Sequence, residues 1–327
     1  MTYKDYIKYR SVWMGAAILW IILFHLHLPG DSFFVTKICN LGYAGSDIFY
    51  FASGLGIWFS LQHTPDVKTF YKKRAHRILP MYWCFIVVWL GFRFWICEMT
   101  IPMAVGNLLG IQVLFGLDGA FNWYITYLLL FYLLAPLIRL LYLKLKQDRL
   151  CMLFLAVLFL VLFLTCHVSQ LTIGLSRLPV FSLGMLFGKM TEEKNEISLP
   201  QTVVMLCLLP VGLGLALYFG ADVLRGWYTG LMWYPLILSV PGTCMVLSLL
   251  GRSTEKFRPA KKGVLPFLGE HTMELYYVHI FVLEVYEKVF LLRMGNTFSY
   301  LHLPVLAAII ALLSRLLKKI TDLIKPL

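Results

Sequence analysis

The sequence has few charged residues. Asp, Glu, Lys and Arg make up 14% of its 327 residues, whereas an ordinary soluble domain has roughly 25%. Hydrophobic residues account for 60%, and the mean hydropathy is +0.76. The apolar runs are uniform and about 20 residues long, unlike the alternating strands of a membrane β-barrel. We therefore predict an all-α fold, a polytopic transmembrane helical bundle.

The sequence also lacks the cysteine patterns of metal sites and disulfide frameworks. Its seven cysteines are scattered, most of them within apolar runs, and no pair has metal-ligand spacing. We interpret them as small core residues. No internal repeat, low-complexity segment or appended soluble domain is visible. We expect one membrane-embedded domain over residues 1–327, with no bound metal.

Acidic residues are fewer than basic ones, and the net charge is +12. Such a charge can indicate a nucleic-acid partner, but 22 of the 29 Lys and Arg residues lie in six stretches, at the chain ends and in every second connection between the apolar runs. This is the positive-inside distribution of a membrane protein, so the basic residues encode orientation. The pattern predicts about ten spans and places both termini in the cytoplasm. The six stretches are residues 4–10, 68–77, 144–149, 189–194, 252–262 and 315–325.

The apolar runs give approximate span boundaries. We expect spans at Val12–Leu28, Leu41–Leu61, Leu79–Cys97, Asn122–Tyr142, Leu150–Cys166, Leu178–Gly188, Thr202–Phe219, Gly230–Leu250, Thr272–Leu292 and Leu301–Leu317. The first is interpreted as a retained signal anchor, because no A-x-A-like cleavage site follows it. Residues 103–115 are weakly apolar and short, which favours a re-entrant or interfacial segment.

Two ionisable residues fall in the outer halves of the first two spans. His25 and Asp47 are costly at membrane depth, so each is a candidate functional residue. A histidine suits abstraction of a hydroxyl proton, and a nearby carboxylate such as Asp47 would hold its tautomer. The alternatives are a buried histidine bonded to a carbonyl and an aspartate used in helix packing. Asp47, Tyr50, Gly54 and Trp58 share one helix face, where the glycine permits close approach of a neighbour.

Arg74 and Arg77 lie three residues apart at the foot of the third span, on the side predicted to be cytoplasmic. Two guanidinium forks on one face suit phosphate binding, although plain orientation charges are the alternative. With His25, they suggest membrane chemistry fed by an anionic, water-soluble donor.

The ninth expected span also contains ionisable residues: Glu274, His279 and Glu284. Glu284 and Lys288 have i, i+4 spacing, which favours a structural ion pair. For His279 the sequence leaves open whether it serves packing or lines a site.

Three segments resemble the strongest signatures of acyltransferase family 3, a family of integral-membrane acyltransferases. They are ILFH (residues 22–25), GYAGSDIFYFASG (42–54) and the R-x-x-R of Arg74 and Arg77. Weaker similarities are NWYITYLLLFYLLAP (122–136), RLPVFSLGMLFG (177–188) and LGEHTMELYYVHIF (268–281). The resemblance implies transfer of an acyl group, usually acetyl from acetyl-CoA, to a hydroxyl of a surface or exported polysaccharide at the bacterial cell membrane. It assigns His25 to catalysis and Arg74 and Arg77 to donor binding or site architecture.

One position departs from the family pattern. Many members have an arginine eleven residues before the histidine, where this chain has Met14. Arg10 lies one turn earlier on the same broad helix face, and our hypothesis is that it substitutes. Other functions stay open: a proton-coupled transporter using His25 and Asp47, or a non-catalytic component of polysaccharide assembly. A covalent acyl-histidine relay is also open.

Overall fold

The computed structural model describes residues 2–26, 33–64, 66–115, 122–165, 169–194, 196–219, 234–255 and 263–324. Within these ranges the chain is helical almost throughout, with a single β-bridge between Thr2 and Glu196 and no strand. The first half contains α1 (Tyr3–Lys8), α2 (Arg10–His25), α3 (Phe33–Asn40), η1 (Leu41–Ala44), α4 (Gly45–Gln62), α5 (Val67–Trp95), α6 (Ile101–Leu108), η2 (Gln112–Phe115) and α7 (Trp123–Leu145). The second half contains α8 (Asp148–Thr165), α9 (Ser169–Leu175), α10 (Leu178–Glu193), α11 (Leu199–Phe219), α12 (Pro235–Thr254), α13 (Val264–Glu270), α14 (Thr272–Val285), the π-helical η5 (Tyr286–Arg293) and α15 (His302–Ile324).

Six helical segments are long and apolar enough to cross a membrane. They are α5, α7, α8, α11, α12 and the segment 171–193, which contains α10. The all-α, membrane-spanning class predicted from composition is therefore confirmed. The other four expected spans coincide with α2, α4, α14 with η5, and α15. The total of about ten spans and the cytoplasmic side of both termini stay predictions.

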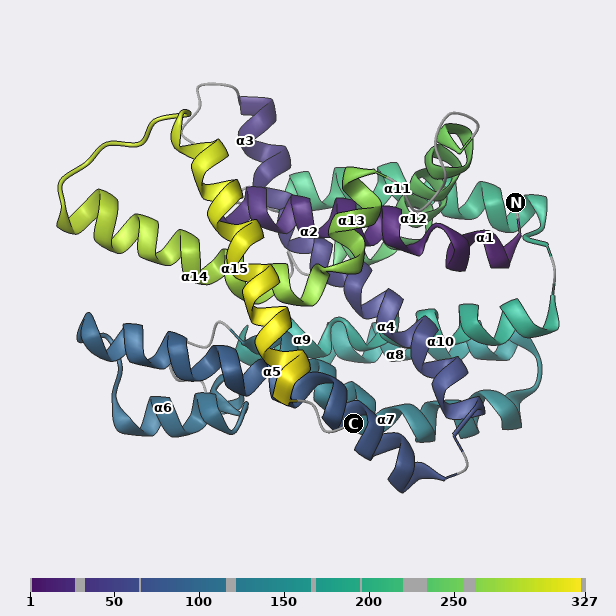
Figure 1. Cartoon of the computed structure of the whole chain (residues 1–327). Helices are drawn as coiled ribbons and strands as arrows, with labels where there is room; N and C mark the ends of the chain where they lie inside the picture. The colour runs from purple at the N-terminus through teal and green to yellow at the C-terminus, as the bar shows by residue number, and fades with distance from the viewer. Residues whose placement is uncertain are drawn as a thin grey trace.

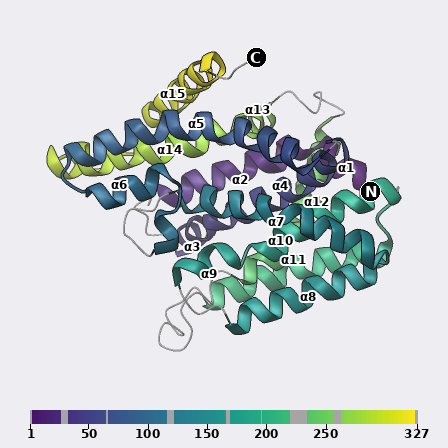
Figure 2. The same ribbon diagram turned by 90° about the horizontal axis from the view of Figure 1, so that it is seen from below.

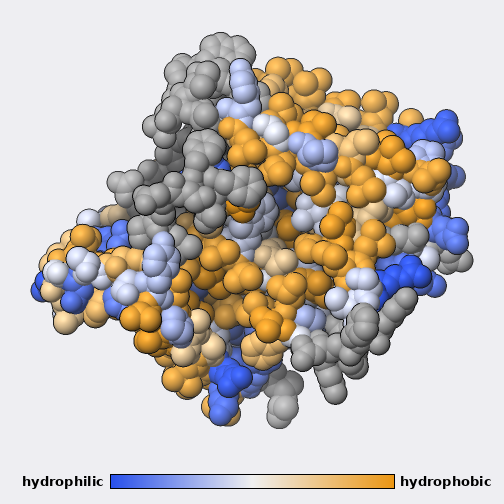
Figure 3. Space-filling view, turned by 90° about the horizontal axis from the view of Figure 1, so that it is seen from above, coloured by the Kyte–Doolittle hydropathy of each residue, from blue (hydrophilic) through white to orange (hydrophobic). Residues whose placement is uncertain are grey.

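The long helices run roughly side by side, and α15 crosses them obliquely (Figure 1). In the view from below, α8 and α11 lie toward one edge of the bundle, and α15 lies outside α5 and α14 at the other (Figure 2). Only 11% of the apolar window of α8 and 17% of that of α11 is buried inside the protein. Apolar faces this exposed suit contact with lipid. Hydrophobic residues also cover much of the face seen from above, with hydrophilic residues gathered toward its edges (Figure 3).

Glycines allow α4 and α10 to pack in close contact, as the shared face of Gly54 predicted. A methyl group on Gly54 would overlap the carbonyl oxygen of Phe181, and one on Gly184 would overlap that of Phe51. Two backbones can approach this closely only where side chains are absent. The α4–α10 pair therefore forms a rigid centre, and α2 and α7 pack on α4 around it.

The expected placement of the cysteines in the core is only partly correct. Cys151 and Cys244 are buried, whereas Cys97 and Cys207 are exposed. An apolar run in a bilayer protein has a lipid-facing side as well as a core side, so hydrophobicity does not predict which way a small side chain faces. The short segment at 103–115 forms α6 and η2 instead of a span.

Candidate functional site

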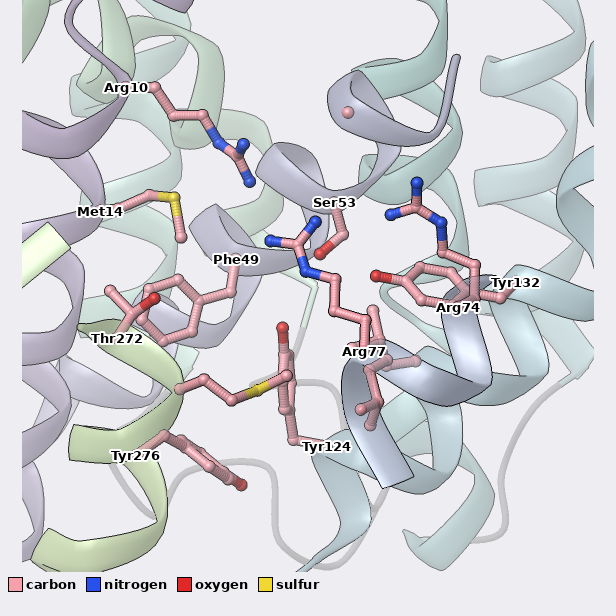
Figure 4. Close-up of a pocket in the computed structure, with 14 residues that line it drawn as sticks. Arg10, Met14, Phe49, Ser53, Arg74, Arg77, Tyr124, Tyr132, Thr272 and Tyr276 are labelled. Atoms are coloured by element: carbon pink, nitrogen blue, oxygen red, sulfur yellow. The ribbon is translucent and has the colours of Figure 1, made fainter. Parts of the chain in front are cut away.

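Three arginines from two distant parts of the chain converge on one cavity. Arg10 is the first residue of α2, and Arg74 and Arg77 lie one turn apart on α5. Their guanidinium groups point toward a shared space (Figure 4). The cavity measures about 210 Å³, and we call it the arginine cavity. Its other lining residues are Met14, Phe49, Ser53, Gly56, Ile78, Tyr124, Leu128, Tyr132, Thr272, Met273 and Tyr276.

The charge of the arginine cavity is not compensated within its walls. None of the described residues that line it is a carboxylate. The Arg74 guanidinium donates to the hydroxyl oxygen of Ser60, but its Nε and that of Arg10 are buried without a hydrogen-bond partner. Buried donors are normally paired, so unpaired guanidinium nitrogens mark a place for an external acceptor. Arginine forks fit phosphate or carboxylate oxygens.

The structure brings the expected donor-binding residues together. Arg10 and Met14, one turn apart on α2, both line the arginine cavity beside Arg77. Arg10 thus reaches the cavity from one turn before the position at which an arginine was expected. Its part in donor binding stays a prediction.

A second cavity of about 420 Å³ adjoins the first. The two share Arg10, Met14, Arg77, Thr272 and Met273, so they lie side by side with these residues in the wall of both. The adjoining cavity is the more open of the two and extends to Lys8, Glu270 and Glu274. Two residues of α1, Ile7 and Lys8, also line the adjoining cavity.

His25 lies away from the arginines, at the last residue of α2. Its Nδ1 is 2.9 Å from the carbonyl oxygen of Ile21 and 3.3 Å from Nε2 of His279 on α14. His279 is fully buried, and its own Nδ1 is 2.7 Å from the carbonyl oxygen of Leu275. The two imidazole rings, 254 residues apart in sequence, therefore form a direct pair.

A third cavity, of about 230 Å³, has His25 in its wall, and we call it the histidine pocket. Its other lining residues are Leu26, Leu283, Tyr286, Glu287, Leu291 and Phe298. It therefore combines a carboxylate, two aromatic rings and the histidine. Hydroxyl-bearing ligands are held by such acceptors and ring faces.

One helix connects the two ends of this site. Tyr276 of α14 lines the arginine cavity, and its ring centroid is 6.0 Å from that of His279. The rings of His279 and His25 are 5.2 Å apart, and Leu283 continues the same face of α14 into the histidine pocket. Because these positions are three or four residues apart, one helix face passes from the arginines to His25.

The expected contact between Asp47 and His25 is not formed. Asp47 lies in the first turn of α4, where its Oδ1 accepts a hydrogen bond of 2.7 Å from Nε of Arg177. Both side chains of this ion pair are fully buried. The reason for the difference is electrostatic, because a guanidinium neutralises a buried carboxylate and a neutral imidazole does not.

The expected ion pair between Glu284 and Lys288 is also absent. Glu284 pairs with Arg93 and accepts a hydrogen bond of 2.8 Å from Nε1 of Trp89, while Lys288 pairs with Glu98. The π-helical η5 begins at Tyr286, between the two residues. Its wider turn changes the angular spacing, so i, i+4 positions no longer face each other.

A comparison with known families gives a match over nearly the whole chain. A family model, described as an acyltransferase domain, matches residues 15–317. The chain belongs to acyltransferase family 3. With its apolar helices, this makes it a multi-pass membrane acyltransferase. Searches of curated proteins and of solved structures found no match.

Two residues of this acyltransferase were not singled out for a site role by sequence reasoning. Arg177 was noted only as the first residue of the RLPVFSLGMLFG segment, and no spacing rule joins it to Asp47, 130 residues away. His279 was noted but left undecided between packing and the site. Its position in a predicted span was the available signal, since ionisable residues at membrane depth are costly. Within the described ranges, no group of three or more His, Cys, Asp or Glu side chains is placed to hold a metal ion.

Proposed function

We propose that this membrane acyltransferase moves an acetyl group from acetyl-CoA to a hydroxyl of a cell-surface or exported polysaccharide at the bacterial cell membrane. The observation that carries the donor assignment is the convergence of Arg10, Arg74 and Arg77 on a cavity whose described walls hold no carboxylate. Acetyl-CoA is a polyanion, and its phosphates suit guanidinium forks. The positive-inside pattern supports a cytoplasmic position for this end of the bundle, on the side where acetyl-CoA is made.

The acceptor would enter from the opposite end, through the histidine pocket. A sugar ring suits a wall with a carboxylate and aromatic rings, which Glu287, Tyr286 and Phe298 supply beside His25. The pantetheine arm of the donor would then extend along the α14 face from the arginines toward His25. This arrangement brings a cytoplasmic donor and an external acceptor to one point without moving either across the bilayer.

In the proposed reaction, His25 acts as the general base. It takes the proton of the sugar hydroxyl as the hydroxyl oxygen attacks the thioester carbonyl carbon. The new C–O bond forms a tetrahedral intermediate, the C–S bond then breaks, and the departing thiolate of CoA receives the proton from His25. No net proton is consumed, and holding both substrates in place supplies much of the rate.

The test is transfer and hydrolysis of radiolabelled acetyl-CoA by the purified protein in lipid vesicles, with crude cell-surface glycan as acceptor. Wild type should consume the thioester and label the glycan, and His25→Ala should do neither. Failure of wild type to consume the thioester with glycan present would contradict the proposal and favour transport or a scaffold role. Label retained on the denatured wild-type protein but absent from His25→Ala would indicate an acyl-histidine relay.

A further inference from the structure

The His25–His279 pair has a defined direction of hydrogen bonding. A carbonyl oxygen can only accept, so the contact from Ile21 requires a proton on Nδ1 of His25, and that from Leu275 requires one on Nδ1 of His279. A neutral imidazole protonated at Nδ1 has its lone pair at Nε2. In His279 this lone pair is 3.3 Å from Nδ1 of His25, so His25 donates and His279 accepts.

We infer that His279 is a positioning residue that holds His25 in the tautomer needed for catalysis. Its Nε2 and the Ile21 carbonyl oxygen share the Nδ1 proton of His25, which leaves the reactive lone pair on Nε2 of His25. This is the role that sequence analysis gave to Asp47, which is instead bound to Arg177. The inference rests on the proposed function of His25 as the base.

The surroundings of His279 fix its own orientation. The side chain is fully buried, and its Nδ1–H is held by the carbonyl oxygen one turn earlier on α14. Tyr276, from the preceding turn of the same face, packs edge-on against its ring. A neutral ring in this position orients His25 without placing a second charge beside it.

Two amides provide a matched pair of variants, because they imitate different nitrogens of the ring. In His279→Gln the amide oxygen can reach the position of Nε2 and accept from His25. In His279→Asn the amide is near Nδ1, so it can donate to the Leu275 carbonyl oxygen but is too short to accept from His25. Both substitutions are neutral, polar and smaller than histidine.

The experiment measures kcat and KM for acetyl-CoA in both variants, in vesicles, beside wild type and His25→Ala. His279→Asn should lower kcat by about tenfold or more, since loss of alignment at a reacting group has effects of this size. KM for acetyl-CoA should stay unchanged, and His279→Gln should retain most of kcat. Equal turnover of the Gln and Asn variants, at any level, would overturn the inference.

The controls separate this inference from the proposed function. If His25→Ala keeps wild-type turnover, the base assignment itself fails. If His25→Ala is inactive while the two His279 variants are equal, only the positioning role fails. A measurement on the wild-type protein does not depend on variant folding: ring-¹⁵N NMR of histidine-labelled protein should show His25 protonated at Nδ1 and unprotonated at Nε2. The opposite tautomer for His25 would also overturn the inference.

Discussion

Asp47 and Arg177 form an ion pair of 2.7 Å in which neither side chain is exposed. The pair joins the first turn of α4 to the residue that precedes α10. The Arg177 guanidinium also hydrogen-bonds the Ser176 hydroxyl oxygen at 3.1 Å and lies 5.4 Å from the ring of Trp123. A buried pair held on several sides stabilises a structure as a unit, because either charge alone would be left uncompensated.

We predict that removing one partner of this pair costs more than removing both. Asp47→Asn or Arg177→Gln should each lower the free energy of unfolding by about 3–5 kcal/mol, and the double variant should be more stable than the sum of the single effects predicts. The double-mutant cycle compares thermal unfolding, in detergent, of wild type, the two single variants and the double variant. Additive effects would show that the two charges do not interact.

The same variants test the catalytic role that the sequence suggested for Asp47. If the ion pair is structural, Asp47→Asn and Arg177→Gln should reduce activity in proportion to the amount of folded protein, and equally. A lower turnover per folded molecule in Asp47→Asn alone would restore a direct part for this carboxylate in catalysis.

The close packing of α4 on α10 gives a third prediction. Gly54→Ala and Gly184→Ala should each destabilise the protein by about 1–3 kcal/mol, because the added methyl group meets backbone atoms of the facing helix, which cannot move aside. Gly91→Ala is the matched control, since Gly91 is also helical but has nothing within 4 Å of the added carbon. The control should be neutral or stabilising by about 0.5–1 kcal/mol. Equal melting temperatures for all three variants would contradict this view of the interface.

Acid should weaken a contact at the end of α5. The pKa of Glu98 is held below its ordinary value, mainly by the hydrogen bond from Lys288. A carboxyl with a lowered folded-state pKa stabilises the protein above its unfolded pKa, and this stabilisation is lost as pH falls through the folded pKa. Glu98→Gln should therefore melt below wild type at neutral pH, and the two should converge in acid. The difference should be small, because both side chains of the pair are partly exposed to solvent. A gap that persists in acid would point to another cause.

Local patterns predicted much of this fold. Apolar runs of span length gave the helices, and the one-turn spacing of Arg74 and Arg77 predicted that their side chains would share a face, as they do in the arginine cavity. The face containing Gly54 was expected to admit a close neighbour, which is α10. Each of these inferences depends on residues within one helix, where the period of the helix determines the answer.

Partnerships between helices could not be predicted in the same way. Asp47 has several basic residues as possible partners, and only the packing of α10 on α4 selects Arg177. His25 and His279 meet because α14 packs on α2, which no spacing in the sequence encodes. The pair expected between Glu284 and Lys288 failed for a local reason, the π-helical turn at η5, since that inference assumed a regular α-helix.

Removing one arginine from the arginine cavity should weaken binding of acetyl-CoA without destabilising the ligand-free protein. Arg10→Ala or Arg77→Ala should raise KM for acetyl-CoA by about tenfold to a hundredfold, as expected for the loss of one charged hydrogen-bonding group. The melting temperature of the ligand-free protein should stay level or rise, because one of three neighbouring like charges is gone. Lys73→Ala is the control: it removes a positive charge from the same end of α5 but does not line the cavity, so KM should change little. Wild-type turnover and KM in Arg10→Ala would rule out its replacement of the arginine expected at Met14.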